Sequence, residues 1–120
     1  MTLKECYTVM DGDYEDVLGR LCSERLIQKF VLKFLDDKNF DVLCRSLEEG
    51  AQEEAFRAAH TMKGMCQNLS FTKLGNSSSQ MAEILRSGDV AGALEMLPQV
   101  REDYARTAEA IRTFQAGLSE

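Results

Sequence analysis

The sequence has one proline, Pro98, and no apolar run close to the roughly 20 residues that a membrane-spanning helix needs. Its N-terminus does not have the basic segment followed by an apolar segment that is typical of a secretory signal. Strand-like alternation bounded by Gly, Pro or Asn is also missing, which argues against a β-rich fold. We therefore expect an all-α protein that does not enter a membrane and, if its source is a bacterium, lies in the cytoplasm.

Basic residues are in the minority, with 14 Lys and Arg against 20 Asp and Glu, for a formal net charge of −6. Nucleic acids and anionic membrane surfaces are bound by clustered basic residues, so neither is an expected partner. The four cysteines, Cys6, Cys22, Cys44 and Cys66, form no C-x-x-C pair, and the chain has one histidine. This pattern supports neither a zinc site nor a disulfide framework. We expect buried, reduced thiols and no metal or other cofactor.

The first third of the chain predicts a short helix or an ordered arm, followed by two helices. The first follows a capping box made by Thr2 and Glu5, and the second follows a capping Asp13. Ser23 caps a third, strongly amphipathic helix that runs to about Asp36. We assign residues 1–36 as accessory helices.

The rest of the chain predicts four longer helices, near 39–50, 51–70, 72–87 and 89–116. Because short connections force neighbouring helices to run antiparallel, we expect an antiparallel up-down four-helix bundle over 39–116, within one domain over 1–120.

Particular residues mark the ends of these four helices. Asn39 and Asp89 are the expected N-caps, and Gly50 is placed to end a helix in the left-handed conformation. Pro98 removes one backbone donor from the last helical region, so we expect a kink or a break there.

The only histidine, His60, lies on the helix near 51–70. The buried stripe of that helix repeats at intervals of 4, 3, 4 and 3 through Ala55, Ala59, Met62, Cys66 and Leu69. At about 100° per residue His60 falls well off the stripe, which predicts an exposed ring. The unperturbed imidazole pKa is about 6.5, so an exposed histidine is mostly the neutral base at neutral pH, and its free nitrogen can attack phosphorus.

Three residues on the next two turns share the surface of His60. Lys63 can supply positive charge to phosphoryl oxygens, although a solvated lysine is a comparable explanation. Gly64 costs about 1 kcal/mol inside a helix relative to alanine, and off the buried stripe it leaves room for a phosphoryl group or another protein. Gln67 can donate a hydrogen bond to the phosphoryl group, but an exposed glutamine needs no explanation.

Apolar residues also project near the face of His60. Phe56 and Phe71 can form an apolar rim for docking a partner, and Met65 can join it. Alternatively these side chains pack under the N-terminal helices, which is as good an explanation for Phe56 and a better one for Phe71.

The segment Arg57-Ala-Ala-His-Thr-Met-Lys-Gly64, followed by Asn68-Leu-Ser-Phe71, resembles the signature of the histidine phosphotransfer (HPt) domain family. The resemblance implies a helical bundle with the histidine on a central helix. It implies that His60 is the phosphoacceptor, that Lys63 and Gln67 contact the phosphoryl group, and that Gly64 gives it room. The expected docking residues for a partner are Phe56, Arg57, Met65 and Phe71.

The chain departs from the family pattern at some positions. Met65 stands where a small residue is common, and Ser70 where a glycine is common. Some relatives orient the imidazole with a carboxylate on the next helix, where this chain has Ala82 with Glu83 beside it. The resemblance therefore leaves open which residue orients the His60 ring.

The function implied by the resemblance is phosphorelay transfer. His60 would accept a phosphoryl group from the aspartyl phosphate of a receiver domain and pass it to another receiver, with a hybrid sensor kinase and a response regulator as partners. The chain has no glycine-rich nucleotide loop, so we expect no kinase activity of its own. The alternatives are a helical adaptor that only binds a signalling partner through this face and a metal-dependent bundle enzyme, which the lack of Glu-x-x-His repeats disfavours.

Overall fold

In a computed structural model, which describes residues 1–119, the chain forms seven helices and no strand. The all-α expectation is confirmed over these residues. The helices are α1 (Leu3–Val9), α2 (Tyr14–Leu21), α3 (Glu24–Phe34), α4 (Asn39–Glu48), α5 (Gln52–Leu69), α6 (Thr72–Arg86) and α7 (Val90–Leu118). None of these helices combines the length and the apolar character needed to cross a membrane.

The N-terminal helices begin where the sequence predicts. Thr2 and Glu5 form both hydrogen bonds of the capping box of α1, and the side chains of Asp13 and Ser23 cap α2 and α3. The α3 helix ends at Phe34, slightly before the predicted Asp36. These caps satisfy backbone N–H groups that short helices leave without partners.

The caps of the later helices follow the predictions in part. Asp89 caps α7 by accepting a hydrogen bond from the Gly92 N–H at 2.8 Å, and Gly50 has the expected positive φ of 69°. The prediction that Asn39 caps α4 is wrong, because Lys38 holds the N-cap position and Asn39 is already helical. The Asn39 side-chain amide donates instead to the Asp37 carboxylate at 2.8 Å.

Of the two outcomes expected at Pro98, a kink or a break, the break does not occur, since α7 is one helix from Val90 to Leu118. Pro98 is exposed, and so is Leu94, whose carbonyl loses its helical hydrogen-bond donor to the proline ring. On the solvent side of a helix that carbonyl can be hydrated, which explains why the helix tolerates the proline.

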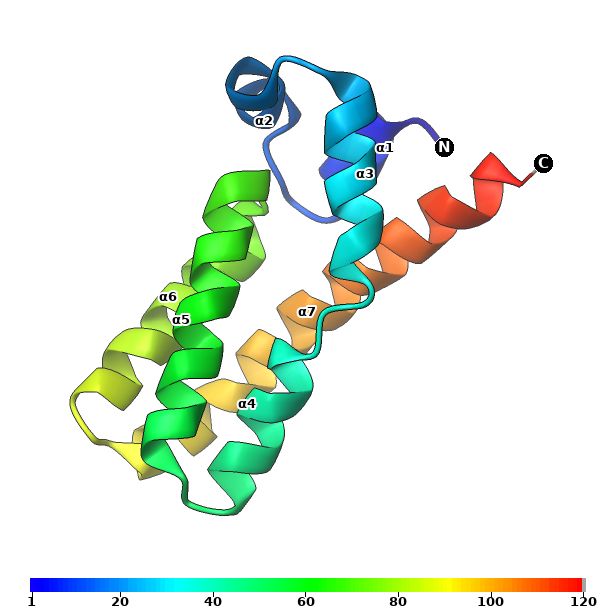
Figure 1. Cartoon of the computed structure of the whole chain (residues 1–120). Helices are drawn as coiled ribbons and strands as arrows, with labels where there is room; N and C mark the ends of the chain where they lie inside the picture. Colours follow the sequence, from blue (N-terminus) through cyan, green and yellow to red (C-terminus); the bar gives the residue numbers. More distant parts are fainter. Residues whose placement is uncertain (120) are drawn as a thin grey trace.

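Packing places α5 between α4 and α6, and α7 lies against α6 and also contacts α4 (Figure 1). The α5 and α6 helices form an antiparallel pair joined by the turn at Ser70 and Phe71. Small residues on α6 permit this close packing: Ser77 and Ser78 are buried, and a Cβ on Gly75 would lie 3.2 Å from the Cβ of Cys66. The α1 helix packs on the far part of α7, and α3 contacts both α5 and α7.

The cysteine prediction is correct for two of the four residues. Cys6 and Cys66 are buried, and burial raises the pKa of their thiols to about 11 and about 12. Cys44 is half-buried, whereas Cys22 is exposed at the left-handed C-cap of α2, so the expectation of four buried thiols is wrong. All four thiols are free.

Candidate functional site

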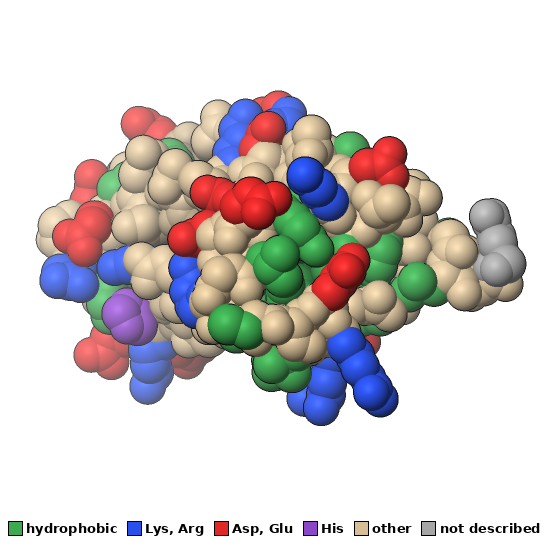
Figure 2. Space-filling model, turned by 90° about the horizontal axis from the view of Figure 1, so that it is seen from above, with side chains coloured by type: hydrophobic (Ala, Val, Ile, Leu, Met, Phe, Trp, Pro, Cys, Tyr) green, Lys and Arg blue, Asp and Glu red, His purple; other side chains and the backbone are tan. Residues whose placement is uncertain are grey.

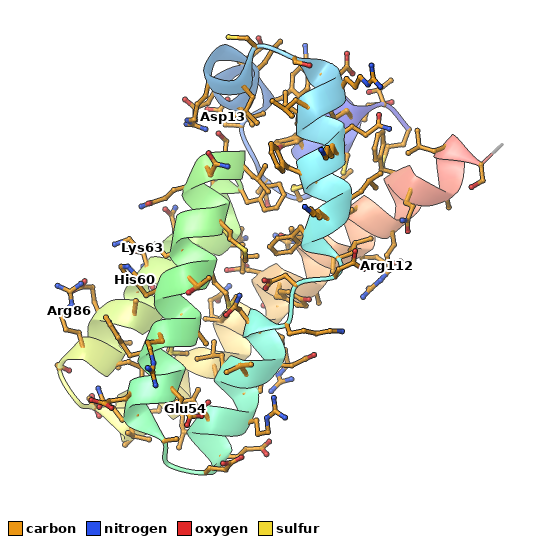
Figure 3. The ribbon with its side chains drawn as sticks, in the orientation of Figure 1. Asp13, Glu54, His60, Lys63, Arg86 and Arg112 are labelled. Carbon is orange, nitrogen blue, oxygen red and sulfur yellow. The ribbon has the colours of Figure 1, made fainter. Side chains whose placement is uncertain are left out.

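His60 is exposed near the middle of α5, as the stripe of apolar residues predicts. The stripe itself is buried, and its members Ala55, Ala59 and Met62 are each no more than 1 % exposed. In Figure 3 the labelled His60 and Lys63 lie together on the side of α5 that faces away from α4 and α7. The ring is therefore accessible to another protein.

The surface next to His60 is open. A Cβ on Gly64 would meet nothing within 4 Å, so the glycine is not needed for helix packing. Lys63 is half-buried and Gln67 is exposed, one and two turns along the helix from His60. The structure thus brings His60, Lys63, Gly64 and Gln67 to one accessible surface.

Phe56 packs against His60. The two rings are stacked, with centroids 5.7 Å apart and planes inclined by 25°. The guanidinium of Arg86 lies over the same Phe56 ring, 5.8 Å from its centroid. Sequence reasoning missed Arg86 because it belongs to α6. The predicted antiparallel hairpin could have indicated this contact. Phe56 lies as many residues before Phe71 as Arg86 lies after it, so a hairpin that turns there brings the two residues together.

Phe71 is not part of this surface, so its predicted docking role is wrong. It is 1 % exposed and packs edge-on against Phe34, with centroids 5.2 Å apart, and against Tyr7 at 5.7 Å. Phe71 follows the end of α5, where the chain has turned under α1 and α3. The alternative explanation, packing beneath the N-terminal helices, is the correct one.

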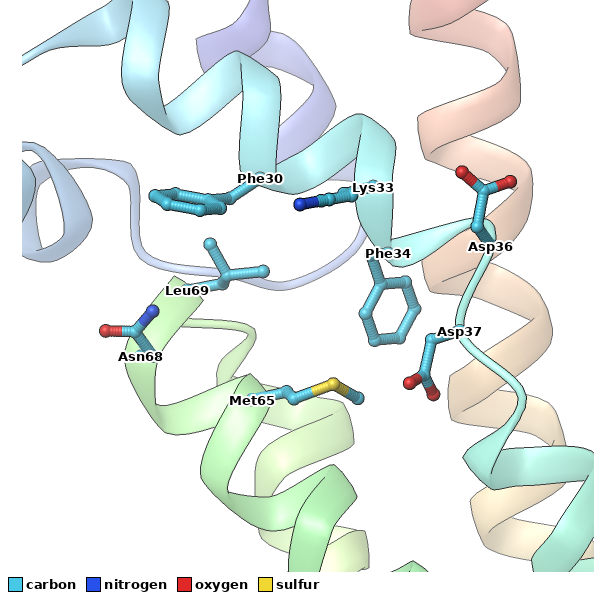
Figure 4. A pocket seen from close by; sticks show the side chains of 8 residues that line it. All are labelled: Phe30, Lys33, Phe34, Asp36, Asp37, Met65, Asn68 and Leu69. Carbon is cyan, nitrogen blue, oxygen red and sulfur yellow. The ribbon is translucent and has the colours of Figure 1, made fainter.

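The other two predicted docking residues face different surroundings. Arg57 is exposed and lies beside Phe56 and Arg86 in a shallow hollow of about 320 Å³. Met65 is half-buried and lines a separate hollow of about 330 Å³ between α3 and the end of α5 (Figure 4). The apolar wall of this second hollow is formed by Phe30, Phe34, Met65 and Leu69.

Charged side chains of both signs surround His60. Lys63 and Arg57 come from α5 and Arg86 from α6, and Figure 2 shows the single histidine in purple with Lys or Arg side chains and also Asp or Glu side chains near it. Glu53 lines the same hollow as Arg57, and Arg86, which Figure 3 places on the same side of the molecule as His60, pairs with Glu83. Lys63 is a cation near His60 that can meet an anionic ligand or partner surface.

The accessory helices hold the end of α5. Ser70, which stands where the family often has glycine, adopts a left-handed φ of 57°. Its hydroxyl donates to the Asp16 carboxylate at 2.7 Å and accepts from Arg20 at 2.9 Å, and Arg20 also donates to the Asn68 carbonyl. Arg20 also donates to the Asp16 carboxylate, and the hydrogen bonds that Asp16 accepts from Ser70 and Arg20 lower its pKa, with Ser70 contributing most. The α2 helix thus ties down the C-terminus of the helix that carries His60.

The model of the Hpt domain family matches residues 26–110. The match covers α4, α5, α6, most of α3 and most of α7, so the chain belongs to the HPt domain family. HPt domains are phosphotransfer modules of two-component signalling that interact with the receiver domains of response regulators, and this chain has a role of that kind. No curated protein and no solved structure was found to match the chain.

Proposed function

We propose that this chain relays phosphoryl groups between receiver domains, with His60 as the phosphoacceptor. A receiver aspartyl phosphate would donate the group to His60, and a second receiver aspartate would then take it. A hybrid sensor kinase and a response regulator are the proposed partners. We further propose that α4 to α7 act as an antiparallel up-down four-helix bundle, that the protein is cytoplasmic, and that it has no kinase activity of its own.

The observation that carries this proposal is the open surface around an exposed His60. A buried imidazole cannot reach the active site of another protein, whereas His60 projects from the middle of α5. The space over Gly64 admits a second protein close to the helix, and Lys63 supplies a cation within one turn.

The chemistry needs little from this chain beyond positioning and charge. A free imidazole nitrogen attacks phosphorus, the bond between phosphorus and the aspartate oxygen breaks, and the aspartate leaves as a carboxylate. The imidazolium that forms can release the proton on its other nitrogen to water. Lys63 and Gln67, which share the outer face of α5 with His60, would bind phosphoryl oxygens as the nitrogen–phosphorus bond forms. Passing the group to the second receiver reverses these steps.

The test is to incubate the protein with a phosphorylated receiver from its source organism. We expect the protein to gain a phosphate that is labile in acid and stable in alkali, as a phosphohistidine is, and to lose it to a second receiver. The His60→Gln variant should gain none, and its thermal unfolding should match that of the native chain because His60 is exposed. Failure of every receiver to phosphorylate the native chain would contradict the proposal.

A non-catalytic adaptor that binds a signalling partner through the same face is the second candidate. The aromatic and basic residues beside His60 fit such a role as well, because Phe56 and Arg86 form a surface that a partner can contact without phosphate transfer. In that case His60→Gln would leave receiver binding unchanged and no phosphate would appear on the native protein.

A further inference from the structure

The His60 ring has an aromatic neighbour on its own helix. Phe56 and His60 stand four residues apart, so their side chains lie one above the other on the same face of α5. The stacked geometry, 5.7 Å between centroids and 25° between planes, is that of an offset aromatic pair. Phe56 is half-buried and His60 is exposed, so the histidine ring lies against a partly anchored platform.

No other contact of this kind orients the ring. Among residues 1–119, no side chain or backbone group forms a hydrogen bond with the His60 imidazole. Ala82 on the neighbouring α6 is 1 % exposed and has no polar side-chain atom. Glu83 beside it pairs with Arg86, with 3.4 Å between carboxylate and guanidinium. Among these described groups the stack on Phe56 is the contact that can orient the ring.

Arg86 holds the platform from the neighbouring helix. Its guanidinium lies 5.8 Å from the centroid of the Phe56 ring, within the range of a cation–π contact. The Glu83 carboxylate pairs with the guanidinium, which limits its freedom. Phe56 is thereby held by α6 as well as by its own helix.

We infer that Phe56 is a positioning residue for the phosphoacceptor, stacking on the His60 imidazole, with Arg86 holding the Phe56 ring in place. This inference rests on the proposed function and extends it. An imidazole that is free to rotate about its ring torsion presents its nitrogen to phosphorus only part of the time. An offset stack raises the ratio of the stacked orientation to the others by roughly 2- to 13-fold. The rate of attack scales with the population of that orientation, so it rises by at most this factor.

The reaction of His60 with phosphoramidate isolates this effect, because the small donor needs no docking surface. The imidazole nitrogen attacks phosphorus, the phosphorus–nitrogen bond of phosphoramidate breaks, and ammonia leaves. We expect Phe56→Leu to slow this reaction by up to about 13-fold, and Phe56→Tyr to restore the native rate because a tyrosine ring also stacks. Arg86→Gln should slow it less, by up to about 5-fold.

A matched control for the arginine variant is Arg112→Gln on α7. Arg112 pairs with Glu109 three residues before it, as Arg86 pairs with Glu83, and the two arginine side chains are 60 % and 59 % exposed. Figure 3 shows Arg112 far from His60. The control removes the same charge and the same kind of ion pair, so its phosphoramidate rate should equal that of the native chain.

The ring orientation is also measurable without any phosphate. The Phe56 ring current should shift the NMR resonances of the His60 ring protons, and Phe56→Leu should abolish that shift while Phe56→Tyr keeps it. Thermal unfolding of each variant verifies that the fold is intact.

A native phosphoramidate rate and unchanged His60 resonances in Phe56→Leu would overturn the inference. If that variant instead loses only transfer from a receiver, Phe56 is a docking residue, and the inference is again wrong. The proposed function fails separately, when no receiver phosphorylates the native chain, because neither the phosphoramidate rate nor the NMR shift depends on a receiver.

Discussion

The outer face of α5 and the C-terminal end of the same helix are built in opposite ways. Around His60 the face is open, with empty space over Gly64 and the Phe56 stack as the main contact of the histidine ring. At the other end, Leu69 to Phe71 are buried under α1 and α3, and the Ser70 hydroxyl is hydrogen-bonded to α2. The open face leaves room for chemistry with a second protein, whereas the closed end holds the helix in place.

Two kinds of contact close that end. The Tyr7 hydroxyl donates to the Leu69 carbonyl at 2.8 Å, which satisfies a carbonyl that the helix end leaves without a donor. Around it, Tyr7, Tyr14, Phe34 and Phe71 pack ring against ring. Stability and reactivity are therefore separated along one helix, and substitutions at the two places should have different effects.

The largest effect on stability should come from Phe71→Ala. Removing a buried ring between Phe34 and Tyr7 leaves a cavity, so we expect the free energy of unfolding to fall by about 3–5 kcal/mol. Urea unfolding measures the loss. At temperatures where the variant is folded, its phosphoramidate rate should stay native, because Phe71 does not reach the surface of His60. Phe71→Leu is the matched control and should cost less than Phe71→Ala, because leucine fills part of the cavity.

A smaller loss should follow from Tyr7→Phe, which removes one buried hydroxyl and keeps the ring. The Leu69 carbonyl then lacks its donor, so we expect a loss of about 1–3 kcal/mol in urea unfolding. Burial raises the pKa of Tyr7 well above its usual range, so its hydroxyl stays protonated and the native hydrogen bond persists at alkaline pH. A variant as stable as the native chain would show that water replaces the hydroxyl.

On the open face, Gly64→Ala should separate stability from function. Because nothing opposes the added methyl group, the variant should gain about 0.5–1 kcal/mol in helix stability. Phosphotransfer from a receiver should nevertheless become slower, since the methyl group occupies the space proposed for the incoming group. Gly75→Ala is the comparison variant, and it should lose stability because its methyl group would press on Cys66.

The smallest effect on stability is expected from a substitution at Asp16. The hydroxyl of Ser70 and the guanidinium of Arg20 lower the pKa of this carboxyl group. A lowered carboxyl pKa in the folded state contributes stability above the ordinary carboxyl range, and that contribution is lost as the pH falls through the lowered value. Asp16→Asn should therefore be less stable than the native chain at neutral pH, and the difference should shrink in acid. A difference that is constant from pH 7 to acid would contradict this assignment.

The sequence was informative wherever a local rule applied. The caps Thr2, Asp13, Ser23 and Asp89 follow from side-chain chemistry at helix starts, and the exposure of His60 follows from the angle between it and its apolar stripe. The predictions that the structure did not confirm depended on the surroundings of the residue in the folded protein. Asn39 does not cap because Asp37 accepts hydrogen bonds from its backbone N–H and its side-chain amide. Of the kink or break expected at Pro98, the break is absent because the proline lies on the solvent side of α7.

Taken alone, the sequence determined that the chain is all helical and that His60, Lys63, Gly64 and Gln67 share one accessible face, because helical periodicity depends only on the order of residues. Tertiary structure decided that Phe71 is buried and that Arg86 reaches Phe56. It also decided that Ser70 joins α2 to the end of α5. The physical reason is that these contacts connect residues on different helices, whose relative placement depends on packing across the whole domain.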